Sequence, residues 1–190
     1  LDDSCTLLAA LRIGIAPPET SIPAPVLHEF LSAAGIISAD TPQPEPVRAF
    51  LEAPRGRALE MLRESWQKAG SFNELHQLPG LIFEGEWTNH PIETREFLLN
   101  LLEPIPDGQW WSIPAFVRDV KQKYPDFQRP VGDYDSWFIK RTADGSFLRG
   151  FGSWGEVDGA LLRYFITSPL FWLGLMDLAS PEENAAPTAF

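Results

Sequence analysis

Cysteine is almost absent from this sequence, and its scarcity removes several classes of protein. One Cys among 190 residues, Cys5, allows neither an internal disulfide nor a cysteine-based metal cluster. This usage is typical of a reducing compartment, so we expect a cytoplasmic protein. The three His residues are far apart, and His28-Glu29 lacks the second His of a zinc-protease helix. The sequence therefore predicts no metal site and no cofactor.

Long apolar runs are also missing. The most apolar stretch, Pro169 to Met176, is far shorter than the roughly 20 residues that a membrane-spanning helix needs. Arg163 and Asp177 bound it on either side, so we expect no membrane partner. The chain begins without Met, and we expect it to be part of a larger protein.

Positive charge is scarce relative to negative charge. The 26 acidic and 15 basic residues give a formal net charge of −11, which weighs against a surface uniformly adapted to nucleic acid. Neither of the glycine-rich phosphate-binding loops occurs, so any helicase activity would lie outside this chain. The acidic pairs Glu84/Glu86 and Asp133/Asp135 fit turns better than acid–base catalysis. We do not expect an enzyme.

The residues that are present predict a helix-rich α+β protein. Its 44% hydrophobic content, with seven Trp and 13 Phe, suffices for a core. Trp154 and Trp172 fall in helical patterns and are expected in that core. Capping-box patterns begin helices at Ser71 and Ser153, and Ser168-Pro169 begins one that Gly174 ends before a buried strand. The apolar periodicities predict helices near 6–12, 25–34, 57–69, 91–103, 112–123 and 153–167, a strand near 36–38 and a β-hairpin over 136–150.

The prolines suggest a division into subdomains. Three of them lie in residues 40–46, which favours an extended linker. We expect a small helical or winged-helix-like subdomain over 1–39 and a main winged-helix-like domain over 47–179 with a hairpin wing. Residues 180–190 are small and acidic and are expected to be a disordered tail.

Several aromatic motifs resemble those of a known group of proteins. The motifs are Trp66, Phe72-Asn-Glu-Leu75, Trp110, Tyr124-Pro-Asp-Phe127, Trp137, Trp154-Gly-Glu-Val-Asp-Gly159 and Pro169 to Leu178. In these the chain resembles bacterial helicase-associated proteins, which are related to the regions attached to helicases of the XPB type. The resemblance covers about residues 55–178 and implies winged-helix-like modules.

Two surfaces are candidates for contact with a partner. Adjacent residues of a strand face opposite ways, so we expect one of the interaction candidates Trp110 and Trp111 to be exposed or at a subdomain seam. Seven of the 15 basic residues lie within 112–150, together with five acids. A winged helix that touches DNA would use such a helix and wing, although a solvated face of mixed charge has the same pattern. The candidate nucleic-acid-binding residues are Arg118, Lys121, Lys140, Arg141 and Arg149.

Two functions remain open at this point. The first is a non-catalytic interaction or scaffold module of a larger, helicase-associated protein, whose partner is another protein or a neighbouring domain. The alternative is a nucleic-acid-binding winged-helix domain that uses the 112–123 helix and the 136–150 hairpin on DNA.

Overall fold

The computed structural model describes residues 1–190 and divides the chain into two compact units, residues 1–72 and 73–190. Seven α-helices and two small antiparallel sheets confirm the helix-rich α+β class. The division falls between Phe72 and Asn73, not in the proline-rich segment 40–46.

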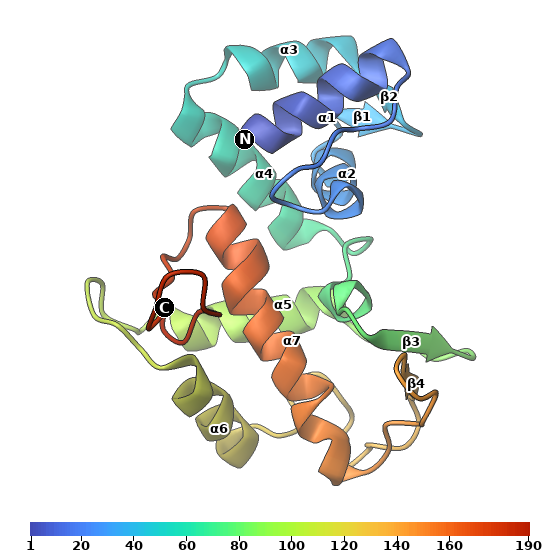
Figure 1. The fold of residues 1–190 in the computed structure, drawn as a ribbon, viewed down its shortest axis with the longest axis vertical. Helices are drawn as coiled ribbons and strands as arrows, with labels where there is room; N and C mark the ends of the chain where they lie inside the picture. The colour runs from blue at the N-terminus through green and yellow to red at the C-terminus, as the bar shows by residue number, and fades with distance from the viewer. The chain divides into compact units, whose positions relative to one another are not determined.

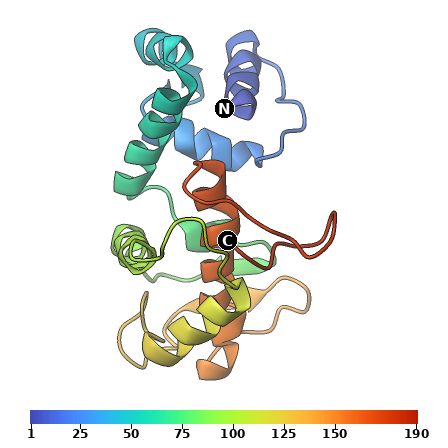
Figure 2. The same cartoon turned by 90° about the vertical axis from the view of Figure 1, so that its left-hand side faces the viewer.

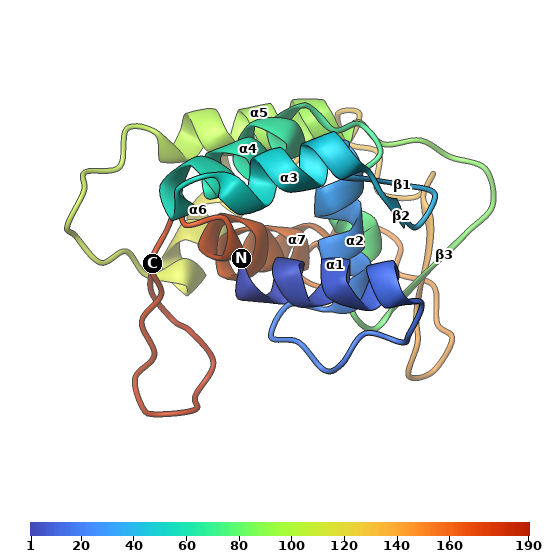
Figure 3. The ribbon, with the colours of Figure 1, turned by 90° about the horizontal axis from the view of Figure 1, so that it is seen from above.

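Unit 1 is a small helical assembly with one two-residue strand pair. Helix α2 packs against α1 and α4, and α3 packs against α4 (Figures 1 and 3). The rings of Phe30 and Phe72 stack in its core, with centroids 4.9 Å apart. Its elements are α1 (Asp2–Ile13), α2 (Ala24–Ala33), β1 (Ile37–Ser38), β2 (Thr41–Pro42), α3 (Pro44–Glu52) and α4 (Arg55–Lys68).

Helix α2 ends as its sequence predicts. Gly35 takes a φ of 65°, a left-handed conformation that costs glycine little. Its N–H donates to the carbonyl of Ser32, and the N–H of Ile36 donates to that of Leu31, which completes a Schellman motif. The chain then enters β1, and Ile36 and Ile37 are buried.

The expected linker at 40–46 is instead part of the fold. Thr41 pairs with Ser38 across the β1–β2 sheet, and α3 begins at Pro44. Proline is tolerated in the first turn of a helix because the N–H groups there have no intrahelical partner. Both Pro44 and Pro46 occupy that turn, so they begin a helix where a linker was expected.

Unit 2 combines a small sheet with helices around an aromatic core. Strand β3 pairs antiparallel with β4, with Phe83 opposite Ile139. The chain after β4 turns back, and the N–H of Leu148 donates to the carbonyl of Ile139. The expected hairpin is present in part: the turn back forms, but its return makes only an isolated bridge between Lys140 and Phe147 and no second strand. Strand β3 was not predicted. The elements are η1 (Glu74–Gln77), β3 (Leu81–Glu84), α5 (Pro91–Leu102), α6 (Ile113–Lys123), β4 (Phe138–Arg141), η2 (Phe151–Gly155), α7 (Asp158–Phe165) and η3 (Ile166–Leu170) (Figure 1).

Both expected capping boxes are wrong. The short helix η1 begins after Asn73, whose side chain accepts from the N–H of Leu75, so Ser71 does not cap it. The Ser153 hydroxyl donates to the carbonyl of Arg149 instead of accepting from the start of a helix. Ser112 behaves as expected: its hydroxyl accepts from the N–H of Ala115 at the start of α6.

Helix α7 passes through Pro169 without a new start. A widened turn, η3, continues it, because Pro169 has no N–H for the regular ladder. After Gly174 no strand follows, which corrects the prediction of a buried strand. Trp172 is only half-buried, whereas Leu170 and Leu173 are in the core.

Residues 180–190 are not a disordered tail. The chain after α7 leaves as a loop and returns to the core of unit 2 at its end (Figure 2). There the backbone of Ala189 pairs with Ala179 and Ser112, and Phe190 is buried. An apolar terminal residue and two short backbone pairings fix a segment whose composition alone suggests disorder.

Candidate functional site

Unit 2 contains an open groove of about 550 Å³. One wall is the end of α5 and the loop that follows it, and the other is the end of the α7–η3 helix. Its lining residues are Leu99, Leu102, Glu103, Ile105, Pro106, Asp107, Gly108, Gln109, Trp110, Leu170, Leu175, Met176, Asp177 and Phe190. Most of these side chains are apolar, as in ligand-binding sites generally.

The loop wall is shaped by proline and glycine. Helix α5 ends at Leu102, whose carbonyl accepts from the N–H of Ile105 and so folds the chain back into a turn. The ring of Pro106 fixes its own backbone φ angle. Gly108 then takes a φ of 75°, which turns the chain toward Trp110. This loop carries Ile105 and Trp110 into the groove lining.

The opposite wall is shaped by a second Schellman motif. Gly174, with a φ of 66°, donates to the carbonyl of Phe171, and the N–H of Leu175 donates to that of Leu170. This pattern usually brings together the two apolar side chains that flank it, and both Leu170 and Leu175 line the groove. The same turn directs Met176 into the lining.

The end of the chain pairs with the backbone of Trp111. The N–H of Trp111 donates to the carbonyl of Phe190 and its own carbonyl accepts from Phe190, at 2.8 and 3.0 Å. The Phe190 ring packs edge-on against Phe116 of α6, with centroids 5.6 Å apart. These contacts hold the backbone next to Trp110, so this side chain projects from an ordered segment.

Both tryptophan candidates are exposed, but only one lines the groove. Trp110 is 62% exposed and lies in the lining, whereas Trp111 is 41% exposed and does not. Glu103, Asp107 and Asp177 are exposed carboxylates of the lining, and no Lys, Arg or His belongs to it. The groove is therefore apolar inside and negatively charged.

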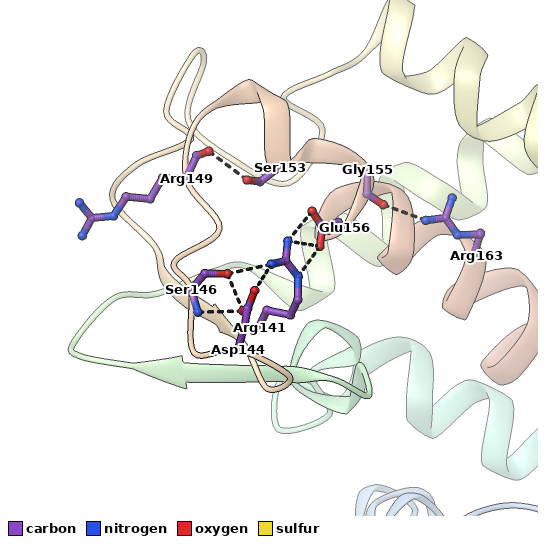
Figure 4. Close-up of polar contacts among 8 residues, drawn as sticks. All are labelled: Arg141, Asp144, Ser146, Arg149, Ser153, Gly155, Glu156 and Arg163. Carbon is purple, nitrogen blue, oxygen red and sulfur yellow. Dashed lines mark hydrogen bonds and ion pairs between the residues drawn. The ribbon is translucent and has the colours of Figure 1, made fainter.

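Two of the five candidate nucleic-acid-binding residues are held by carboxylates of this chain. Arg141 binds Glu156 through two nitrogens, at 2.7 to 2.9 Å, and donates to Asp144 at 2.8 Å (Figure 4). Hydrogen bonds from Ser146 and Arg141 lower the pKa of Asp144 to about 2. The Lys140 ammonium lies 2.7 Å from Glu84 on the neighbouring strand β3. These ion pairs reduce the positive potential of the hairpin.

Among the other three candidates, Lys121 and Arg149 lie against aromatic rings, and Arg149 shares the Phe147 ring with Lys140. The Arg149 guanidinium points away from Arg141 (Figure 4) and lies 4.8 Å from the centroid of the Phe147 ring. Lys121 lies over Phe151, at 4.9 Å, and Arg118 is exposed on α6. Cation–aromatic contacts leave the positive charge in place, so Arg118, Lys121 and Arg149 remain available to an anion.

Two buried ion pairs were not expected from the sequence. Arg95 donates two hydrogen bonds to Glu74, at 2.8 and 3.0 Å, and both side chains are almost completely buried. Arg95 lies three residues before Leu98 on the buried stripe of α5. A charge on an apolar helical stripe was the available signal, and it points to a buried partner.

The second buried pair joins the start of α7 to the segment after α6. Asp158 accepts from Arg129 and Gln128, at 2.8 and 2.7 Å, through a single carboxylate oxygen. Burial raises the pKa of Asp158, even with the Arg129 charge beside it. The Arg129 guanidinium also lies 4.2 Å from the centroid of the Trp137 ring. These contacts fix elements to each other inside unit 2, and they lie outside the groove.

The remaining polar candidates have ordinary structural partners. The Asp133 carboxylate accepts from the N–H groups of Asp135 and Ser136, as in a turn. His76 stacks on Phe83, and burial lowers its pKa. No cluster of three or more His, Cys, Asp or Glu side chains is arranged to hold a metal ion. None of the helices combines the length and the apolar composition needed to cross a bilayer.

The aromatic motifs behind the resemblance differ in their positions. Trp66, Trp137 and Trp154 are buried, so they act in packing, whereas Trp110 is exposed. The resemblance to helicase-associated proteins remains a prediction. No protein-family model, curated protein or solved structure matches the chain.

Proposed function

We propose that this chain is a non-catalytic interaction module that binds a segment of another protein, or of a neighbouring domain, in the groove of unit 2. The observation that carries the proposal is the exposed Trp110 at the edge of a concave apolar surface of about 550 Å³. Tryptophan is among the residues that contribute most to binding energy at protein interfaces. An apolar surface that stays exposed on a folded chain commonly marks an interaction site.

The order of elements in unit 2 supports a winged-helix interpretation of this module. A short helix (η1), a strand (β3), two helices (α5 and α6) and a hairpin built on β4 follow one another, which is the order of parts in such a unit. Here η1 is a single four-residue turn, and α7 is added after the hairpin. We accordingly propose a modified winged-helix-like unit within a larger, helicase-associated protein.

Protein binding is favoured over nucleic-acid binding by the distribution of charge. Lys140 and Arg141 of the hairpin are engaged with carboxylates of the same unit. A phosphate backbone would have to compete with Glu84, Asp144 and Glu156 for them, at a cost in affinity. In contrast, a partner could bury the apolar surface of the groove without breaking any of these ion pairs.

A selection of random peptides displayed on phage tests the proposal. We expect enriched peptides to bind the chain with micromolar affinity and to bind Trp110→Ala at least about 10-fold more weakly, because the central aromatic contact is lost. Trp111→Ala is the matched control, since this exposed tryptophan lies outside the groove lining. Equal affinity for native protein and Trp110→Ala would refute the proposed site.

DNA binding is measured in parallel. Salt-sensitive binding of a DNA duplex that weakens in an Arg118→Gln/Arg149→Gln variant, with no peptide enriched, would replace the proposal by the nucleic-acid alternative.

A further inference from the structure

The charged residues of the groove all have the same sign. Glu103 and Asp107 come from the loop after α5, and Asp177 comes from the segment after Gly174, so both walls contribute carboxylates. All three are exposed, and no cationic side chain lines the surface between them. An occupant would meet negative potential from either side.

The apolar part of the groove sets the size of the anchor. A cavity of about 150 Å³ can hold one benzene molecule, so about 550 Å³ accommodates two or three side chains of that size. Leu102 and Leu170 form buried parts of the lining, and the unbranched Met176 can adapt to the shape of an inserted group. The groove thus fits a short run of large apolar side chains.

Three kinds of occupant are disfavoured by this arrangement. A phosphate-bearing ligand and an acidic peptide would both place negative charge beside Glu103, Asp107 and Asp177. A second copy of the chain carries the same formal charge of −11, so its approach is opposed by like-charge repulsion.

We propose that the occupant of the groove is a cationic amphipathic segment, in which two or three large apolar side chains are flanked by Lys or Arg. This inference rests on the proposed interaction function and adds the chemistry of the partner. The apolar side chains fill the groove and contact Trp110, and the flanking cations lie beside the three carboxylates. Complementary charge of this kind contributes specificity and speeds association more than it adds affinity.

Three synthetic peptides test the inference. They carry the same Leu and Trp anchors, and the flanking positions are all Lys, all Gln or all Glu. Titration calorimetry at low salt should show the Lys peptide binding about 10-fold more tightly than the Gln peptide, since each exposed charge pair contributes modestly. At about 1 M salt, where charges are screened within about 3 Å, the two affinities should converge.

Two matched variants separate the groove carboxylates from the net charge of the protein. Glu103→Gln/Asp107→Asn/Asp177→Asn should remove the preference for Lys over Gln. The control Glu86→Gln/Glu96→Gln/Asp119→Asn neutralises three exposed carboxylates outside the groove lining and should leave that preference intact.

The outcomes distinguish this inference from the proposed function. Equal binding of the Lys and Gln peptides, or equal effects of the two triple variants, would overturn the cationic partner while leaving the groove as an interaction site. A preference for the Glu peptide would do the same. If no peptide binds, or if Trp110→Ala changes none of the affinities, the proposed function fails as well.

Discussion

The buried pair of Arg129 and Asp158 makes a quantitative prediction about stability and pH. In Arg129→Met, Asp158 keeps its hydrogen bond from Gln128 but loses the only cation bonded to it. Removing one partner of a buried ion pair typically costs about 3–5 kcal/mol. The variant has an escape, because Asp158 can bind a proton instead of remaining charged.

Protonation sets an upper limit on the cost of the unpaired carboxylate. From an unfolded pKa of about 3.9, protonating an aspartate costs about 4 kcal/mol at pH 7 and about 1.5 kcal/mol at pH 5. Loss of the Arg129 contact with Trp137 adds about 1 kcal/mol at either pH. The destabilisation by Arg129→Met should therefore be about 4–5 kcal/mol at pH 7 and smaller by about 2 kcal/mol at pH 5.

The sign of this pH dependence follows from proton binding. Burial already raises the pKa of Asp158 in the native chain, and loss of Arg129 raises it further. The folded variant then binds more protons than the unfolded one, so stability is lost as pH rises from the unfolded pKa toward the folded pKa. Asp158→Asn in the Arg129→Met background should abolish the extra pH dependence.

Urea unfolding followed by tryptophan fluorescence measures these effects. Six of the seven Trp residues lie in unit 2, so the signal reports mainly on that unit. Arg118→Met is the matched control: this exposed arginine of α6 should change stability by no more than about 0.5 kcal/mol. A destabilisation by Arg129→Met below about 1 kcal/mol, or one that is equal at pH 7 and pH 5, would refute the reasoning.

Two further predictions concern the groove wall and the hairpin. Gly174→Ala should destabilise unit 2 by about 1–2 kcal/mol in urea unfolding, because an L-residue is strained at a φ of 66°. The control Gly56→Ala should not destabilise the protein, because Gly56 lies in α4 without a positive φ. An unchanged stability of Gly174→Ala would argue against the Schellman turn. Hydrogen bonding lowers the pKa of Asp144 to about 2, so its contribution to stability is present above the unfolded pKa of about 3.8 and is lost as pH falls toward 2. Asp144→Asn should remove that part of the acid dependence measured by thermal unfolding between pH 4 and pH 2, and an unchanged acid dependence would contradict the hydrogen bonding at Asp144.

Local signals were enough to predict much of the helical structure. The stop at Gly35, the cap at Ser112 and the stripe of Trp154, Val157, Leu161 and Phe165 each depend on residues within a few turns of one another. The turn after β4 is likewise local, because it returns the chain to β4 within a few residues.

Other features depend on partners distant in the sequence and could not be predicted locally. Strand β3 has only four residues and gains its hydrogen bonds from β4, more than 50 residues later. In the sequence, Glu74 matches a capping-box pattern. In the structure it forms a buried ion pair with Arg95, a tertiary contact that no local pattern reveals. Pro44 looked like a linker residue because proline is equally suited to a spacer and to the first turn of a helix.

The candidate site shows the same limit: the sequence predicted that one of Trp110 and Trp111 would be exposed, but not that Trp110 would line a groove. Trp110 becomes part of a groove only because Leu170, Leu175 and Asp177, which come much later in the sequence, lie in the same lining. For the cations of the hairpin, the fold removes a feature that the sequence predicted. In the sequence they form a basic cluster, but in the fold Glu84 lies beside Lys140, and Glu156 binds Arg141. Tertiary structure thus neutralises part of the predicted nucleic-acid surface and assembles an acidic groove elsewhere, which is why the charge of the partner is the property to test first.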